Sequence, residues 1–81
     1  PQFENMVQFF TENQFSLLKA IAKDRIVAQP TSGKFIKEHK LNGASSVKAA
    51  LKVLEDKELV YRTNEGYIIY DRFMDLWLKR I

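Results

Sequence analysis

The chain has 81 residues, of which 46% are hydrophobic, and this is enough for one domain with a single buried core. It has no cysteine, which excludes disulfides, cysteine-based zinc sites and thiol catalysis. Its formal net charge of +3, from 13 basic and 10 acidic residues, is mild, so the position of the charges matters more than their sum.

The first ten residues are apolar on several sides and predict a short helix, or the end of a helix that belongs to a preceding domain. Because the chain opens at Pro1 and not at Met, we expect it to be part of a longer protein. Residues 1–81 are expected to form one domain, since they contain no repeat, low-complexity segment or flexible linker. They show no secretory signal and no long apolar run, so we expect a cytoplasmic location without a membrane partner.

A strong helix start follows this segment. Thr11 is a suitable N-cap, and Gln14 three residues later completes a capping box. Phe10 and Phe15 stand where a hydrophobic staple would join them. A helix is therefore predicted over residues 12–24, with core-facing side chains at Phe15, Leu18, Ile21 and Ala22.

A brief extended segment is expected at residues 26–29. It is partly β-branched, and Pro30 disfavours a helical conformation in the residue before it. We expect this segment to pair at the edge of a small sheet. A second, short helix should follow, capped by Thr31 or Ser32 and ending near His39.

The second helix is expected to turn Phe35 and Ile36 toward the core. Leu41 should fill the turn that follows. Asn42 and Gly43 are expected to supply the special backbone angles of that turn, because both residue types tolerate positive φ.

The stretch at residues 43–57 has the most regular pattern in the chain, and it should begin a helix within a residue or two of Gly43. Its apolar side chains recur at the i, i+3, i+4 and i+7 spacing of a helix buried along one side. Those side chains are Val47, Ala50, Leu51 and Leu54. The opposite side carries short, polar or cationic residues, namely Ser45, Lys48, Ala49 and Lys52.

After this helix the period changes to two, which indicates strands. Residues 59–62 and 67–70 are expected to pair as a hairpin around a turn at 63–66. Asp71 then caps a final helix. We expect most of that helix to be core, with Phe73, Trp77 and Ile81 along one face and Met74 and Leu78 beside it. An exposed docking patch is expected from some of Phe3, Phe9, Leu76 and Ile81.

This order of elements predicts a mainly α fold with a small β-hairpin wing (α+β), a winged helix-turn-helix. Such a fold places the second helix of the helix-turn-helix in the major groove of DNA, here residues 43–57. The expected contacts on that helix are Ser45, Ser46, Lys48, Ala49 and Lys52. Phosphate contacts are expected from Lys34, Lys37 and Lys40, and wing contacts from Arg62, Thr63 and Asn64.

The alternative is that these lysines form an ordinary solvated surface. The outward side of residues 43–57 has no arginine, and its helix body has no outward asparagine or glutamine, which make the strongest direct contacts to bases. We therefore expect weak or phosphate-dominated binding to double-stranded DNA. Glu55, Asp56 and Glu58 oppose binding, although they lie at the end expected to point away from the groove.

Other candidate chemistry has a simpler explanation. His39 is the only histidine and falls on or near the buried side of its helix, so we expect a packed or boundary residue and no metal site. Ser45 and Ser46 have no base partner. Asp71 and Asp75 suit the start of the last helix, where acids interact favourably with the helix dipole.

Residues 31–34 superficially resemble a phosphate loop. The pattern fails, because Ala28 stands where a glycine is needed and Phe35 where serine or threonine is needed. With no nucleophile–base pair and no metal cluster in view, we expect no enzyme activity and no cofactor in this chain.

Across nearly its full length the chain resembles the winged helix-turn-helix superfamily, and more narrowly the C-terminal winged-helix domain of prokaryotic AAA-type P-loop ATPases. The runs that carry this resemblance are residues 14–22, 30–32 with Phe35, 45–47 with 50–51 and Leu54, 57–60, 66–73 and 76–78. The chain departs from the pattern at Ala44 and Arg72, where a proline is expected. Proline in the first helical turn is a structural convenience, so the fold assignment stands.

The resemblance implies an ATPase domain before Pro1 that holds the nucleotide site, and a role in transcription regulation. It also implies an alternative to DNA binding, in which the domain docks on its own ATPase domain or on another partner. Self-association through the N-terminal segment and the last helix is a further possibility that the apolar residues there leave open.

Overall fold

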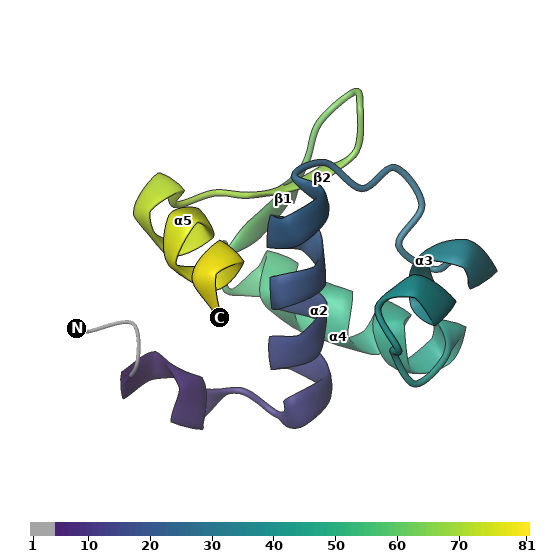
Figure 1. Cartoon of the computed structure of the whole chain (residues 1–81), viewed down its shortest axis with the longest axis horizontal. Coiled ribbons are helices and arrows are strands. Elements are labelled where there is room, and N and C mark those ends of the chain that lie inside the picture. Colours follow the sequence, from purple (N-terminus) through teal and green to yellow (C-terminus); the bar gives the residue numbers. More distant parts are fainter. Residues whose placement is uncertain (1–4) are drawn as a thin grey trace.

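The computed structural model describes residues 5–81, and the predicted winged-helix order of elements is confirmed (Figure 1). A 3-10 turn, η1 (Val7–Phe9), precedes the main body. The remaining elements are α2 (Glu12–Asp24), α3 (Gly33–Glu38), α4 (Ala44–Asp56), β1 (Val60–Arg62), β2 (Tyr67–Ile69) and α5 (Arg72–Arg80). The expected helix within the first ten residues lies partly outside the described residues. Phe3, expected as part of an exposed patch, lies outside them.

Helix α2 is the centre of the molecule. It contacts α4, α5 and β2, and in Figure 1 it runs between α5 on one side and α3 on the other. The predicted capping box is confirmed: Thr11 Oγ1 accepts from the Gln14 N–H, and Gln14 Oε1 accepts from the Thr11 N–H, both at 3.1 Å. The buried side chains of α2 are Leu17, Leu18, Ala20, Ile21 and Ala22, with Phe15 half-buried beside them.

Helix α3 begins at a serine cap, since Ser32 Oγ accepts a hydrogen bond from the Phe35 N–H at 3.2 Å. Phe35 is buried and Ile36 half-buried, as predicted. The prediction for the following turn is wrong in one respect. The left-handed residue is Lys40, at φ 54°, whereas Gly43 is extended at φ 161°.

The geometry of the helix end explains why Lys40 takes this conformation. The Leu41 N–H donates to the Ile36 carbonyl at 2.9 Å, and the Lys40 N–H donates to the Lys37 carbonyl at 3.2 Å. These two bonds form a Schellman motif, which requires a left-handed residue immediately after the helix cap. Helix α4 ends in the same way, with Glu58 at φ 61°.

The hairpin pairs Val60 with Ile69, Tyr61 with Ile68 and Arg62 with Tyr67 in antiparallel register. The expected third segment is reduced to a single bridge, in which Val27 and Tyr67 exchange two backbone hydrogen bonds of 2.8 and 3.0 Å. Gly66 is needed here: its φ is 143°, and a Cβ atom would lie 2.6 Å from the Val27 carbonyl oxygen.

Helix α5 begins where predicted, with Asp71 Oδ1 accepting from the N–H groups of Phe73 and Met74 at 2.8 and 3.2 Å. Its core-facing stripe consists of Met74 and Leu78, which are buried, with Trp77 half-buried. The expectation for Phe73 is wrong, because this side chain is 75% exposed. Of the residues expected to form an exposed patch, Phe9, Leu76 and Ile81 are exposed.

Candidate nucleic-acid interface

Helix α4 presents the face on which the DNA hypothesis rests. Its buried stripe is the predicted one, Val47, Ala50, Leu51 and Leu54. The side chains predicted to point outward are all exposed, namely Ser45, Lys48, Ala49 and Lys52. Gly43 caps the helix without a side-chain hydrogen bond, and no atom lies within 4 Å of the position of a Cβ there. The outward face of α4 is therefore accessible and cationic, and no side chain of residues 5–81 covers the N-terminus of the helix at Gly43.

The two lysines of this face differ in their surroundings. Lys52 Nζ lies 3.8 Å from Asp56 Oδ2, one turn further along the helix, and both side chains are well exposed. Such surface pairs are weak and exchange readily with other anions. Lys48 has no ion pair within residues 5–81. Lys48 is therefore the more available cation of the pair.

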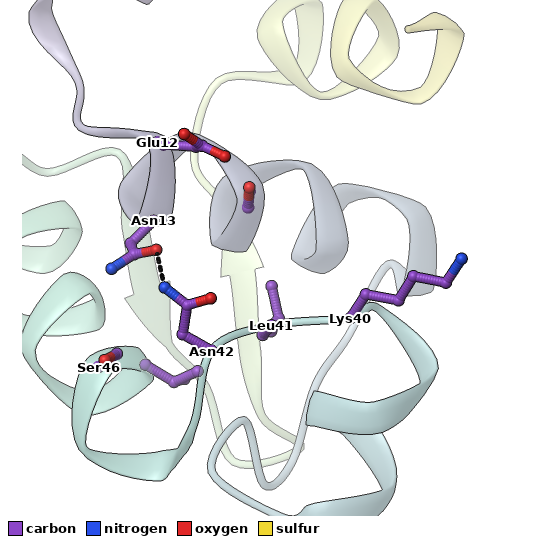
Figure 2. Close-up of a pocket in the computed structure, with 8 residues that line it drawn as sticks. Glu12, Asn13, Lys40, Leu41, Asn42 and Ser46 are labelled. Carbon is purple, nitrogen blue, oxygen red and sulfur yellow. Dashed lines mark hydrogen bonds between the residues drawn. The ribbon is translucent and has the colours of Figure 1, made fainter.

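Ser46 lies off the outward face. It is half-buried and lines a small pocket between the start of α4 and the first turn of α2 (Figure 2). In that pocket Asn42 Nδ2 donates to Asn13 Oδ1 at 2.6 Å. Ser46 is thus placed for the contact between helices, and the outward face consists of the other four predicted residues.

The lysines on and after α3 are all exposed, and two of them border different hollows. Lys40 borders the pocket beside α2, and its side chain points away from the asparagine pair in Figure 2. Lys34 lines a different hollow, together with Asp24 and Glu38. Lys37 lies between them in the sequence, with no ion pair in the described part of the chain.

The wing offers fewer groups than expected. Arg62 and Asn64 are exposed. The Thr63 hydroxyl is half-buried and already engaged, since it donates to the Gly66 carbonyl at 2.8 Å and accepts from the N–H groups of Glu65 and Gly66. Thr63 therefore holds the turn together. Of the predicted wing residues, Arg62 and Asn64 keep free side chains, and the exposed, acidic Glu65 lies beside them.

Tyr67 is a residue of this surface that sequence reasoning missed. It lines a shallow open groove together with Ser45, Lys48 and Lys52 of α4, although it is the first residue of β2. The register of the hairpin pairs it with Arg62. The predicted pairing of residues 59–62 with 67–70 could have shown that an aromatic side chain and an arginine sit side by side next to α4.

His39 is a boundary residue, as expected. Its ring packs on Phe35 at 4.8 Å between centroids, and its Nε2 lies 3.0 Å from Asp24 Oδ1. Glu38 completes a group whose candidate ligand atoms lie within 4.8 Å of one another. Sequence reasoning missed this group because Asp24 is remote along the chain. One imidazole and two largely open carboxylates are one ligand short of a four-coordinate structural zinc site.

A short helix, a tight turn, an exposed second helix and a two-stranded wing follow one another along the chain. Helix α2 packs on α4, α5 and β2, and α5 also packs on β2. This arrangement defines a winged helix-turn-helix domain. Residues 1–80 match the model of a family described as a probable winged helix domain, and the chain belongs to this family. No curated protein and no solved structure matches the chain. Within the described residues, no helix has the length and apolar character needed to cross a membrane.

Proposed function

We propose that this domain binds double-stranded DNA, with α4 in the major groove and the wing against the backbone. The observation that carries the proposal is the outward face of α4, where Ser45 and Ala49 allow close approach and Lys48 and Lys52 flank them. All four side chains are exposed on the helix that follows the tight turn. This is the element that winged-helix and other helix-turn-helix domains insert into the groove.

Phosphates are the better partners for this face than base edges. Lysine acts as a mobile point charge, whereas arginine reads guanine through a planar pair of donors. The outward face of α4 holds lysines and serine, and its body carries no arginine. Arg62 in the wing adds a third cation. The proposed mode is therefore binding with little preference for sequence, to which Tyr67 can add one hydroxyl contact.

The expected salt dependence follows from the number of cations. Each neutralised phosphate contributes about −0.9 to the slope of log K against log salt concentration, so three cations correspond to a slope of about −3. Glu55 and Asp56 lie at the C-terminal end of α4 and repel phosphate there. We infer that the N-terminal half of α4 approaches the DNA more closely than the C-terminal half.

The proposal is for a non-catalytic domain in a cytoplasmic protein. Support for a non-catalytic role comes from four polar side chains whose hydrogen bonds serve helix caps and the hairpin turn, namely Thr11, Ser32, Thr63 and Asp71. A parent with an AAA-type ATPase domain, and a role in transcription regulation, are proposals supported by the sequence resemblance alone.

Titration of a fluorescein-labelled duplex of mixed sequence, followed by anisotropy at low salt, tests the DNA proposal. The double variant Lys48→Glu/Lys52→Glu should abolish saturable binding. The matched control is Lys57→Glu/Arg80→Glu, which changes the net charge equally at exposed positions away from the outward face. Absence of binding by the unaltered chain, or equal loss in both variants, would contradict the proposal.

A further inference from the structure

A second candidate surface, besides the outward face of α4, is an open groove of about 400 Å³ between the outer side of the hairpin and one side of α5. Four large apolar side chains line it and are 43% to 73% exposed, namely Ile26, Tyr61, Tyr70 and Leu76. Residues 5–81 have seven exposed large apolar side chains in total, so more than half of them gather here. Concentration of this kind marks an interaction surface, whereas single scattered apolar residues do not.

The hairpin register builds the floor of this groove. Val60 and Ile69 point into the core, so Tyr61 and Ile68, which alternate with them, point outward. The rings of Tyr61 and Tyr70 meet edge to face with centroids 5.7 Å apart. Aromatic residues held in this way offer contact area at low cost in side-chain entropy.

The rim of the groove is basic. Arg25 and Arg72 both line it, and neither forms an ion pair with a residue in the described range 5–81. The one acidic side chain of the lining, Asp75, is bonded to Lys79 at 2.9 Å. An apolar floor with two unpaired arginines at its edge is complementary to a ligand that is apolar and acidic.

The backbone at Arg25 is a separate observation at the same place. Arg25 has φ 71° and ψ −56°, and the Ile26 N–H donates to the Asp24 carbonyl at 2.8 Å across it. This is the rare form of γ-turn, which is strained for a residue with a side chain. Strain of this kind persists mainly where it positions a group for function. Here it sets Arg25 at the rim and Ile26 in the lining.

We propose that this groove binds an acidic segment with spaced apolar side chains, supplied by a partner protein. A second copy of the chain fits less well. In a two-fold dimer the same patch faces itself, so the unpaired Arg25 and Arg72 would face a surface with the same basic rim and no free acidic side chain. The proposal is independent of DNA binding, because the groove includes none of the α4 side chains.

Selection from a random peptide library displayed on phage tests this inference, with the full chain immobilised. Enriched peptides should combine Asp or Glu with Leu, Ile, Phe or Trp. A labelled peptide from the selection should lose affinity by about tenfold or more for Arg25→Glu/Arg72→Glu and for Leu76→Ser. Two controls should keep full affinity: Phe73→Ser, an exposed residue of α5 outside the groove lining, and the Lys48→Glu/Lys52→Glu variant.

Three results would overturn the inference. They are failure to enrich any peptide over an empty support, enrichment of basic peptides, and equal affinity for the Arg25→Glu/Arg72→Glu variant. Sedimentation of the chain alone tests the other possible occupant, a second copy of the chain. A concentration-dependent dimer that Leu76→Ser abolishes would assign the groove to that second copy. Thermal melting of each variant verifies that these exposed substitutions leave the fold intact.

Discussion

Asn42 donates a 2.6 Å hydrogen bond from Nδ2 to Oδ1 of Asn13, which joins the turn before α4 to the first turn of α2 (Figure 2). The two residues are far apart in sequence, and this bond fixes the start of α4 against the central helix. Buried contacts of Val47 hold the next turn of α4 in place. The N-terminal end of α4 is therefore anchored to α2, and the buried Ala50, Leu51 and Leu54 hold the rest of the helix against the core.

Replacing Asn42 with alanine should lower the free energy of unfolding by about 0.5–1 kcal/mol, because one exposed hydrogen bond is lost. A double-mutant cycle with Asn13→Ala, measured by urea denaturation, isolates this bond. The double variant should be at most a few tenths of a kcal/mol less stable than Asn42→Ala alone. Additive losses would show that the two side chains act separately.

Gly66→Ala should be strongly destabilising, by about 2–3 kcal/mol, because a Cβ atom there meets the Val27 carbonyl and the backbone has positive φ. Gly33→Ala is the matched control. It adds the same methyl group at a helical position with no atom within 4 Å, and it should be neutral or slightly stabilising. Similar melting temperatures for the two variants would contradict the close approach of the wing to Val27.

Lys40→Gly and Glu58→Gly should each stabilise the protein by about 0.5–1 kcal/mol. Both residues hold left-handed φ at the end of a Schellman motif, where glycine avoids the steric cost of a side chain. Lys48→Gly, in the interior of α4, should instead lose about 1 kcal/mol. Chemical denaturation distinguishes these opposite signs, and a loss of stability at position 40 would place the turn elsewhere.

Asp71→Ala should cost about 1–2 kcal/mol, since one carboxylate oxygen serves two N–H groups at the start of α5. Asp71→Asn retains an acceptor oxygen and should recover most of the loss. The melting temperatures of the two variants give this comparison. Equal destabilisation by both would assign the effect to charge and not to capping.

The lysines of α4 should contribute unequally to DNA binding. Lys48→Ala should weaken binding more than Lys52→Ala, because Lys52 shares its charge with Asp56. Asp56→Asn should in turn strengthen binding, since it releases Lys52 and removes a negative charge from the face. Anisotropy titrations at one fixed salt concentration measure all three, and weaker binding by Asp56→Asn would refute this assignment.

Local signals made much of this fold predictable. The capping box at Thr11, the serine cap of α3 and the aspartate cap of α5 each act within a few residues, so their helices begin where expected. The buried stripe of α4 was predictable because the period of its apolar residues admits one face only.

The missed features depend on contacts between distant parts of the chain. Two adjacent apolar stripes run along α5, and only its packing against α2 decides that Met74 is buried and Phe73 exposed. The hydroxyl of Thr63 was expected to face DNA, and its use inside the turn depends on the conformation of Gly66. The groove beside Tyr61 was missed because Ile26 and Leu76, which both line it, lie far apart in the sequence.

The bridge between Val27 and Tyr67 has a consequence for how the wing can respond to a ligand. Its two hydrogen bonds fasten β2 to the connection between α2 and α3, so the hairpin cannot swing without breaking both. The backbone of Arg62, paired with Tyr67, is held in place before any partner arrives. Because the wing is already ordered, binding does not cost the entropy of ordering a mobile arm. A domain with few charged contacts therefore keeps more of the binding free energy that these contacts supply.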